Sequence, residues 1–287
     1  MTEVLVMQSL ITGVLLGTFY ALFGLGLSIV WGITGFVNVA HGAFAVLAAY
    51  VAYFMVSIFQ MDLVISSPLV VLFFLAFGYF LFKTLVRALI GKPMINTLIF
   101  FFGLFSLIYA ISLVWFGTTF RMLITPLTFA GVNIHGIVLS LPRFTVGVLS
   151  AILYALSAWF FNKTKIGKAI RATAQSKDAA ELMGIDTISM YTVAFGYGLA
   201  MAAFSGICIG ILESFNPEAM MTLLPVAFAV CVLGGYGSIR GSLVAGLIIG
   251  ILESIVSVFW PLYRAAVVSM AIIFTLLVRP RGIFGEV

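Results

Sequence analysis

This sequence has very little charge. Only 8% of its 287 residues are Asp, Glu, Lys or Arg, against about 25% in an ordinary soluble domain, while 63% are hydrophobic and the mean hydropathy is +1.27. So few charged side chains cannot coat a soluble protein of this length, and the apolar runs reach the roughly 20 residues that a helix needs to cross about 30 Å of hydrocarbon. A soluble protein is therefore excluded, and an all-α polytopic membrane protein in a lipid bilayer is predicted.

Cysteine is almost absent, and the N-terminus lacks basic residues. Cys208 and Cys231 are the only cysteines, and both lie in apolar runs, so they are expected to be small buried residues rather than a disulfide framework. The first ten residues carry Glu3 but no Lys or Arg, which excludes the basic start of a cleaved signal peptide and predicts that the first apolar segment is retained. The net charge of +5 reflects Lys and Arg in cytoplasmic loops, and no nucleic acid partner is expected.

The apolar runs predict about 8–9 transmembrane helices, with one or two broken or re-entrant segments among them. The predicted spans lie near residues 8–30, 43–59, 64–86, 94–116, 136–161, 188–212, 223–239, 242–260 and 263–278. Positive residues collect on the cytoplasmic side of membrane proteins. Three groups of Lys and Arg therefore place two loops and the C-terminus in the cytoplasm. The first loop carries Lys83, Arg87 and Lys92, the second carries Lys163, Lys165, Lys168, Arg171 and Lys177, and the C-terminus carries Arg279 and Arg281. If every span is complete, the N-terminus lies outside.

Two glycine-rich connections, residues 31–42 and 232–241, do not resemble ordinary loops. Each has little charge, each is followed at once by another apolar run, and they fall in opposite halves of the chain. Paired glycine-interrupted segments are typical of broken helices that line a transport path, because irregular backbone at membrane depth needs protein or a water-filled cavity around it. The alternative is that each is a tight cytoplasmic turn. The candidate residues are Asn38, His41, Gly42, Gly234, Gly235, Gly237 and Ser238.

Asn38 and His41 stand where a spanning helix would carry apolar residues. In a helix break, the Asn38 side chain could cap freed backbone groups, and Gly42 allows the chain to turn where a Cβ would clash. His41 could donate to a backbone carbonyl and fix the bend, or it could face the pathway. The sequence near it offers no second metal ligand and no acidic proton-relay partner, so neither a metal site nor a relay is predicted. We expect His41 to form a bend-fixing hydrogen bond beside the pathway.

One motif occurs twice: GICIGILES at 206–214 and GLIIGILES at 246–254. Glycines four residues apart lie on one helix face and let a second helix approach closely, which promotes helix association in lipid. The match could also be chance in a sequence of low diversity. Both helices are predicted to run outward, so that Glu213 reaches the external interface and Glu253 lies at it or somewhat below. Glu253 is a candidate functional residue, because a carboxylate inside the membrane is costly.

Residues 162–187 form the only long hydrophilic stretch, NKTKIGKAIRATAQSKDAAELMGIDT. Its pattern predicts one short helix over about 166–174, and a second that has Ser176 as N-cap, Asp178 in its first turn and Gly184 as its stop. Its apolar side chains could form a face that docks on a cytoplasmic partner: Ile170, Ala174, Ala179, Ala180, Leu182, Met183 and Ile185. The alternative is a charged loop that only holds two helices on the positive side.

Five collinear motifs carry a resemblance to a known family. They are FVNVAHG (36–42), TKIGKAIRA (164–172), AAELMGI (179–185), VLGGYGSIRG (232–241) and RPRGIFG (279–285). Together they resemble the branched-chain amino acid permease family of bacterial ABC importers, and its shorter H-type subunit most closely. The loose coupling-loop pattern EAAxxxG of such permeases is matched by Asp178, Ala179, Ala180 and Gly184. The chain departs from the family at Ala43, where an acidic residue is usual, and at Val39, where Phe is frequent, so the substrate could differ from leucine, isoleucine and valine.

The resemblance implies a single transmembrane permease domain over 1–287, with the coupling loop 162–187 inside it, in the bacterial inner membrane. It also implies a second related permease, two cytoplasmic ATPases that carry ATP and Mg²⁺, and an external solute-binding protein as partners. The residues that would couple the chain to the ATPases are Gly167, Arg171, Ala172, Asp178, Ala179, Ala180, Gly184 and Ile185. Neither GKP at 91–93 nor GKA at 167–169 lies in a GxxxxGK(S/T) P-loop, so we expect no enzyme activity and no cofactor of this chain's own.

The predicted function is therefore the membrane-spanning permease subunit of an ATP-driven importer for branched-chain or related amino acids, forming half of a translocation pathway that works by alternating access. An ion-coupled secondary transporter of a small polar solute is the alternative, although only Glu253 and Arg264 qualify as coupling groups within the spans. An intramembrane serine protease would need a Gly-x-Ser-Gly segment before a helix, and the sequence has none.

Overall fold

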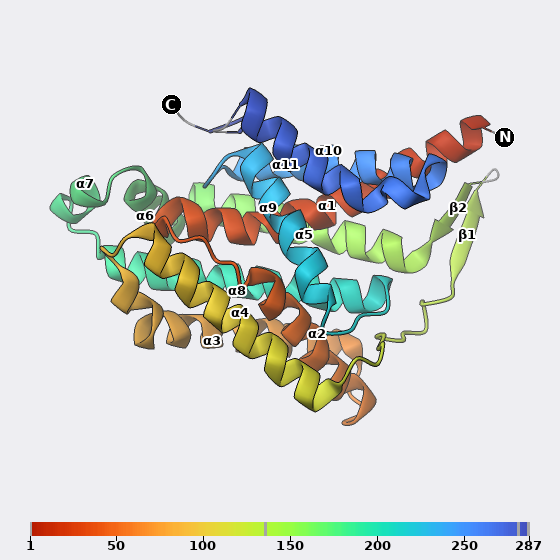
Figure 1. Ribbon diagram of the computed structural model, residues 1–287, viewed down its shortest axis with the longest axis horizontal. Coiled ribbons are helices and arrows are strands. Elements are labelled where there is room, and N and C mark those ends of the chain that lie inside the picture. Colours follow the sequence, from red (N-terminus) through yellow and green to blue (C-terminus); the bar gives the residue numbers. More distant parts are fainter. Residues whose placement is uncertain (1, 135–136, 280–281, 286–287) are drawn as a thin grey trace.

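The computed structural model describes residues 2–134, 137–279 and 282–285, which form a bundle of long helices with one small β-hairpin (Figure 1). The α-helices are α1 (Thr2–Thr34), α2 (His41–Ser57), α3 (Leu63–Thr84), α4 (Met94–Phe116), α5 (Leu141–Lys163), α6 (Lys165–Gln175), α7 (Lys177–Leu182), α8 (Thr187–Leu212), α9 (Ala219–Gly234), α10 (Ile239–Phe259) and α11 (Arg264–Val278). The 3-10 helices are η1 (Val86–Leu89) and η2 (Pro261–Tyr263), and the strands are β1 (Gly131–Ile134) and β2 (Ile137–Ser140).

The long apolar helices agree with the predicted spans. Within the described ranges, seven helices are long and apolar enough to cross a bilayer: α1, α3, α4, α5, α8, α10, and α11 together with η2. α2 and α9 are apolar too, but have only 17 and 16 residues. Each predicted span corresponds to one of these nine helices, which confirms the all-α membrane fold. The predicted 8–9 crossings are approximate, because the two short helices fall below the length that spans a bilayer.

α1 and α8 form the centre of the bundle. In each of them 78% of the apolar stretch is buried inside the protein. The buried share is only 28% for α4 and 11% for η2 together with α11. The peripheral helices instead expose large apolar side chains, among them Phe80, Ile99 and Leu277. An apolar surface of this extent is stable only against lipid or another subunit.

Glycines set the closest helix contacts. α1 and α10 pack against each other over much of their length, and a Cβ added at Gly250 would lie 2.4 Å from the backbone nitrogen of Gly17. α8 approaches α2 more closely still, because a Cβ at Gly206 would lie 1.8 Å from the carbonyl oxygen of Ala45. Each of the two repeated glycine motifs therefore brings its helix into backbone contact with a neighbour, as the sequence predicts.

The β-hairpin is a departure from the predicted all-α architecture. β1 and β2 pair antiparallel with Gly131 opposite Ser140, and α5 begins only at Leu141. The predicted span over 136–161 therefore starts too early. The strands GVNI and IVLS are rich in the β-branched residues that favour an extended backbone. A strand of this composition has the same hydropathy as the first turn of an apolar helix, so hydropathy alone does not distinguish the two.

Candidate functional site

The connection between α1 and α2 is a buried, irregular segment. α1 ends at Thr34, Gly35 takes a φ of +69°, which favours glycine, and residues 36–40 are not helical before α2 starts at His41. The buried residues of this stretch are Phe36, Val37, Asn38 and Ala40. A surface loop would leave these backbone groups in water, so this segment belongs to the interior of the bundle.

α2 begins well inside the bundle rather than level with the end of α1. Nε2 of His41 donates a hydrogen bond to the carbonyl oxygen of Phe23 at 3.2 Å. Phe23 lies three helical turns, or about 16 Å, before α1 ends at Thr34. The chain therefore folds back along α1 before α2 starts (Figure 1). Of the two readings open for 31–42, this geometry supports a re-entrant break and not a tight turn.

Asn38 and one ring nitrogen of His41 are left without hydrogen bonds. Asn38 is fully buried, and neither its side-chain oxygen nor its nitrogen has a partner within the described ranges; the same holds for Nδ1 of His41. The expected capping by Asn38 is therefore wrong, and Ala40, directly before α2, supplies no side-chain cap either. Because unsatisfied polar atoms in an apolar interior are costly, these two side chains are candidates for contacts with a solute or with water.

Gly42 fits the start of α2 against α9. A Cβ at Gly42 would lie 2.9 Å from the carbonyl oxygen of Met220 and 3.0 Å from the backbone nitrogen of Leu224, both in the first turns of α9. The expected turn at Gly42 is therefore wrong, because Gly42 lies in the first turn of α2, and the clash that a Cβ would cause is with α9. The start of α2 thus lies against the Phe23 region of α1 and against the start of α9.

The second glycine-rich connection is a tight turn. Only residues 235–238 join α9 to α10, and Gly235 and Gly237 have φ values of +94° and +72°. The N–H of Gly237 donates to the carbonyl oxygen of Ser28 in α1 at 3.1 Å, and Ser238 is the N-cap of α10. The broken-helix reading of this connection is therefore wrong, because a few residues at glycine-favouring angles complete the reversal.

The C-terminal motif packs on this turn, a contact that the sequence did not predict. The N–H of Ile283 donates to the carbonyl oxygen of Leu233 at 2.8 Å. The N–H of Phe284 donates to the carbonyl oxygen of Gly234, the last residue of α9, at 3.2 Å. Arg281, one of the two arginines that predict a cytoplasmic C-terminus, lies outside the described residues. Two motifs that are far apart in the family pattern thus form one structural unit.

The hydrophilic segment forms the two predicted short helices, α6 and α7. The Ser176 side chain accepts from the N–H of Ala179 at 3.3 Å as the N-cap of α7, and Gly184 follows the helix with a φ of +78°. Both predicted ends of α7 are confirmed. At the start of α8, the Ser189 hydroxyl donates to the carboxylate of Asp186, the N-cap, and this hydrogen bond lowers the pKa of Asp186 below its usual value.

Some of the predicted coupling residues lie on the inner side of this segment. Gly167 seats α6 on the end of α5, because a Cβ there would lie 2.3 Å from the carbonyl oxygen of Phe160. Nε of Arg171 donates to another backbone carbonyl of α5 at 3.1 Å. Ala180 and Ile170 are each only 3% exposed, so their predicted place on the docking face is wrong. Amphipathic helices of this length bury one side against their own protein.

The outer side of the segment is the end of α7, which projects from one end of the bundle (Figure 1). Leu182 and Met183 are 88% and 82% exposed. Of the other predicted coupling residues, the exposed ones are Asp178, Ala179 and Gly184, and the half-buried ones are Ala172 and Ile185. Two large apolar side chains in water at the end of a charged segment are typical of an interaction site.

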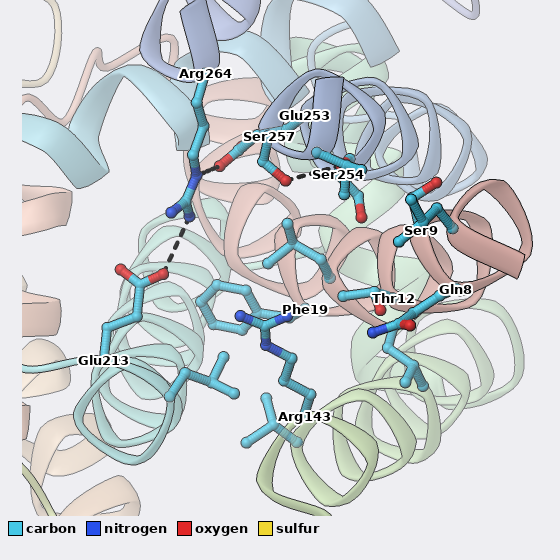
Figure 2. Close-up of a pocket in the computed structure, with 16 residues that line it drawn as sticks. Gln8, Ser9, Thr12, Phe19, Arg143, Glu213, Glu253, Ser254, Ser257 and Arg264 are labelled. Atoms are coloured by element: carbon cyan, nitrogen blue, oxygen red, sulfur yellow. Dashed lines mark hydrogen bonds and ion pairs between the residues drawn. The ribbon is translucent and has the colours of Figure 1, made fainter. Parts of the chain in front are cut away.

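A cluster of charged and polar side chains joins four helices, α1, α8, α10 and α11, at the end of α5 away from α6. Nε of Arg264, the first residue of α11, donates to Oε1 of Glu253 at 2.7 Å, and its Nη2 donates to Oε1 of Glu213 at 3.1 Å. The hydroxyl of Tyr20 in α1 donates to Oε2 of Glu253 at 2.8 Å. Glu213 and Glu253 are the carboxylates of the two ILES motifs, so the repeat converges on a single cation (Figure 2).

A cavity of about 150 Å³ lies beside this cluster, between α1, α5, α8, α10 and α11 (Figure 2). Its lining includes Gln8, Thr12, Arg143, Glu213, Glu253 and Arg264. α5 starts at the cavity and ends at α6, so its 23 residues separate the cavity from the coupling segment by about 35 Å.

The predicted pathway residues occupy three separate places: the re-entrant break, the 235–238 turn and this cavity. Arg143 was not predicted, since one cation next to an apolar run gives no signal of its partners.

Comparison with known proteins identifies the family. The family model for the permease component of branched-chain amino acid transport systems matches residues 9–278. The chain is 28% identical over 294 residues to the high-affinity branched-chain amino acid transport system permease protein BraD of Pseudomonas aeruginosa, and 30% identical over 299 residues to LivH of Salmonella typhimurium; each alignment covers 98% of this chain and 96% of the relative. No solved structure gives a significant match. This chain belongs to the branched-chain amino acid transport permeases, which are membrane transport subunits and not enzymes.

Proposed function

We propose that this chain is the membrane-spanning permease subunit of an ATP-driven ABC importer for branched-chain or related amino acids, and that it forms half of the translocation pathway. Family membership supports the permease role. The observation that carries the ATP-driven mechanism is the projecting end of α7, where Leu182 and Met183 are exposed within a charged segment. Such a surface fits an apolar groove on a separate subunit.

The partners follow from that role. Two cytoplasmic ATPases, which bind ATP and Mg²⁺, dock on α6 and α7 of this chain and on the matching segment of a second, homologous permease. An external solute-binding protein delivers the substrate at the opposite end. The complex lies in the bacterial inner membrane, with α7 and the C-terminus in the cytoplasm, because the five Lys and Arg residues within 162–187 favour that side.

Transport proceeds by alternating access. ATP binding draws the two ATPases together, and α6 passes the movement to the spans, because Gly167 seats it on the end of α5 and Arg171 holds a carbonyl there. α5 reaches the cavity at its other end, so a tilt of α5 changes access to that cavity. Hydrolysis then resets the helices, and the two sites are coupled through one rigid element.

Gly184→Leu is expected to uncouple transport from ATP. Leu at a φ of +78° costs about 1–2 kcal/mol, so the end of α7 would rearrange and displace Leu182 and Met183. Uptake by the reconstituted complex should fall by about tenfold, because about 1.4 kcal/mol of lost docking free energy is a factor of ten in the docking equilibrium. The solute-binding protein should still associate, but loaded binding protein should no longer stimulate ATP hydrolysis.

Gly117→Leu is the matched control for that experiment. Gly117 also has a positive φ, +65°, and a Cβ there would meet no atom within 4 Å, but it ends α4 at the other end of the bundle. We expect its backbone strain to leave the coupling intact. If ATPase stimulation survives in Gly184→Leu, the assignment of α7 as the docking site fails.

His41→Leu is expected to give a protein that inserts into the membrane but transports poorly. The substitution removes the hydrogen bond to Phe23 and the imidazole ring that stacks on the Phe23 ring at 5.0 Å. One buried hydrogen bond contributes about 0.5–1.5 kcal/mol, and here it fixes the depth at which α2 begins. His41→Gln keeps a donor and should retain part of the uptake. Uptake at the wild-type rate by the Leu variant, at equal amounts of inserted protein, would refute the role.

The ATP dependence of uptake tests the proposal against an ion-coupled secondary transporter. Vesicles that hold the assembled complex should accumulate substrate only with ATP, and ionophores that collapse ion gradients should not stop them. Uptake that follows an ion gradient without ATP would favour the alternative. Glu253 and Arg264, the coupling candidates of that alternative, bind each other at 2.7 Å, and this pairing supports a structural role for both charges.

A further inference from the structure

The cavity beside the charged cluster contains more polar groups than its own ion pairs require (Figure 2). Arg264 is already bound by two carboxylates, at 2.7 Å by Glu253 and at 3.1 Å by Glu213. Glu253 uses both of its oxygens, because Oε2 accepts from the hydroxyl of Tyr20. Arg264 and Glu253 are therefore satisfied within the protein, and neither has a charge left for a ligand.

Two opposite charges at the cavity remain available. Arg143 has no hydrogen bond or ion pair within the part of the chain that the structure describes, and its side chain is exposed. Glu213 uses only Oε1 for Arg264, and its side chain is 57% exposed. Figure 2 shows Arg143 extending from α5 and Glu213 from α8 toward the same cavity. A cation and an anion on separate helices thus face one space without binding each other.

The rest of the lining is an apolar wall with a few neutral polar groups. Leu15, Leu16 and Phe19 of α1 and Val146 of α5 supply the apolar surface. Thr12 adds a hydroxyl to the lining. A ligand that matches this lining carries one negative group, one positive group and an apolar substituent.

We infer that this cavity is a binding subsite for a zwitterion with an apolar substituent, such as an α-amino acid. The carboxylate of the ligand binds the guanidinium of Arg143, whose planar fork suits a bidentate pair. The ammonium group binds Oε2 of Glu213, and the side chain lies against Phe19 and its neighbours. The subsite belongs to the permease itself, at the end of α5 away from α6, and its place in transport rests on the proposed function.

The charges of the ligand and of the two side chains can be tested separately. The full chain in lipid nanodiscs would be titrated with L-leucine, with 4-methylpentanoate, which lacks the ammonium group, and with 3-methylbutylamine, which lacks the carboxylate. L-leucine should bind at least tenfold more tightly than either analogue. Arg143→Gln should weaken L-leucine and 4-methylpentanoate binding by tenfold or more and leave the amine unchanged. Glu213→Gln should weaken L-leucine and the amine and leave 4-methylpentanoate unchanged.

Lys163→Gln is the matched control, because Lys163 is an exposed cation at the other end of α5 and should leave all three affinities unchanged. The inference is overturned if wild-type protein does not bind L-leucine, or if the two pocket variants bind it as wild type does. Equal loss of all three ligands from either variant would also overturn it, since the two charges would then not act separately. Failure of the proposed function would appear elsewhere, as uptake without ATP, and would leave these affinities as they are.

Discussion

Arg264→Met should destabilise the protein by about 3–5 kcal/mol, because it leaves Glu253 buried without its cation. The Glu253 side chain is 6% exposed and lies 2.7 Å from Nε of Arg264. A carboxylate left without a cation inside a helix bundle keeps the cost of its desolvation and loses the interaction that offsets it. The midpoint of thermal unfolding in detergent, followed by size-exclusion chromatography, measures the loss.

Two further variants separate the buried pair from the exposed one. Glu213 also binds Arg264, but its side chain is 57% exposed, so Glu213→Gln should cost about 1 kcal/mol or less. The double variant Arg264→Met with Glu253→Gln should recover most of the stability, because the amide still accepts from Tyr20 and no buried charge remains. An Arg264→Met protein that melts with the wild type would show that Glu253 does not depend on this cation.

Gly206→Ala is expected to cost about 3 kcal/mol or more, although it adds only one methyl group. The new Cβ would lie 1.8 Å from the carbonyl oxygen of Ala45 and 2.6 Å from its carbonyl carbon. Backbone atoms cannot move aside as a flexible side chain can, so α8 and α2 would have to separate along their contact. Because α2 also forms the re-entrant break, we expect the variant to lose transport together with stability. The yield of monodisperse protein and its melting temperature measure the effect.

Gly103→Ala is the control for a methyl group added to a helix. Gly103 lies in α4, where a Cβ would meet no atom within 4 Å. Ala is about 1 kcal/mol better than Gly in a helix interior, so this variant should be as stable as the wild type or slightly more stable. If Gly206→Ala and Gly103→Ala behaved alike, the close approach of α8 to α2 would not be a feature of the folded protein.

The sequence alone determined the features that depend on neighbours within a few residues. The apolar runs placed the nine helices, since twenty apolar residues have few alternatives to a helix in lipid. The ends of α7 were equally predictable, because Ser176 and Gly184 act on backbone groups within one turn. Even so, the same local reading missed the β-hairpin before Leu141, where strand and helix have similar hydropathy.

The tertiary structure decided everything that depends on how distant segments pack. From the sequence, both 31–42 and 232–241 could be a broken helix or a tight turn. The hydrogen bond of His41 to Phe23 identifies the first as a re-entrant break, and the four residues 235–238, with Gly235 and Gly237 at positive φ, identify the second as a turn. The convergence of Glu213 and Glu253 on one arginine likewise arises from helices that meet in space. Burial, ion pairing and the depth of a break depend on which residues meet in the folded protein. Because those residues are far apart in the chain, the local sequence pattern does not predict them.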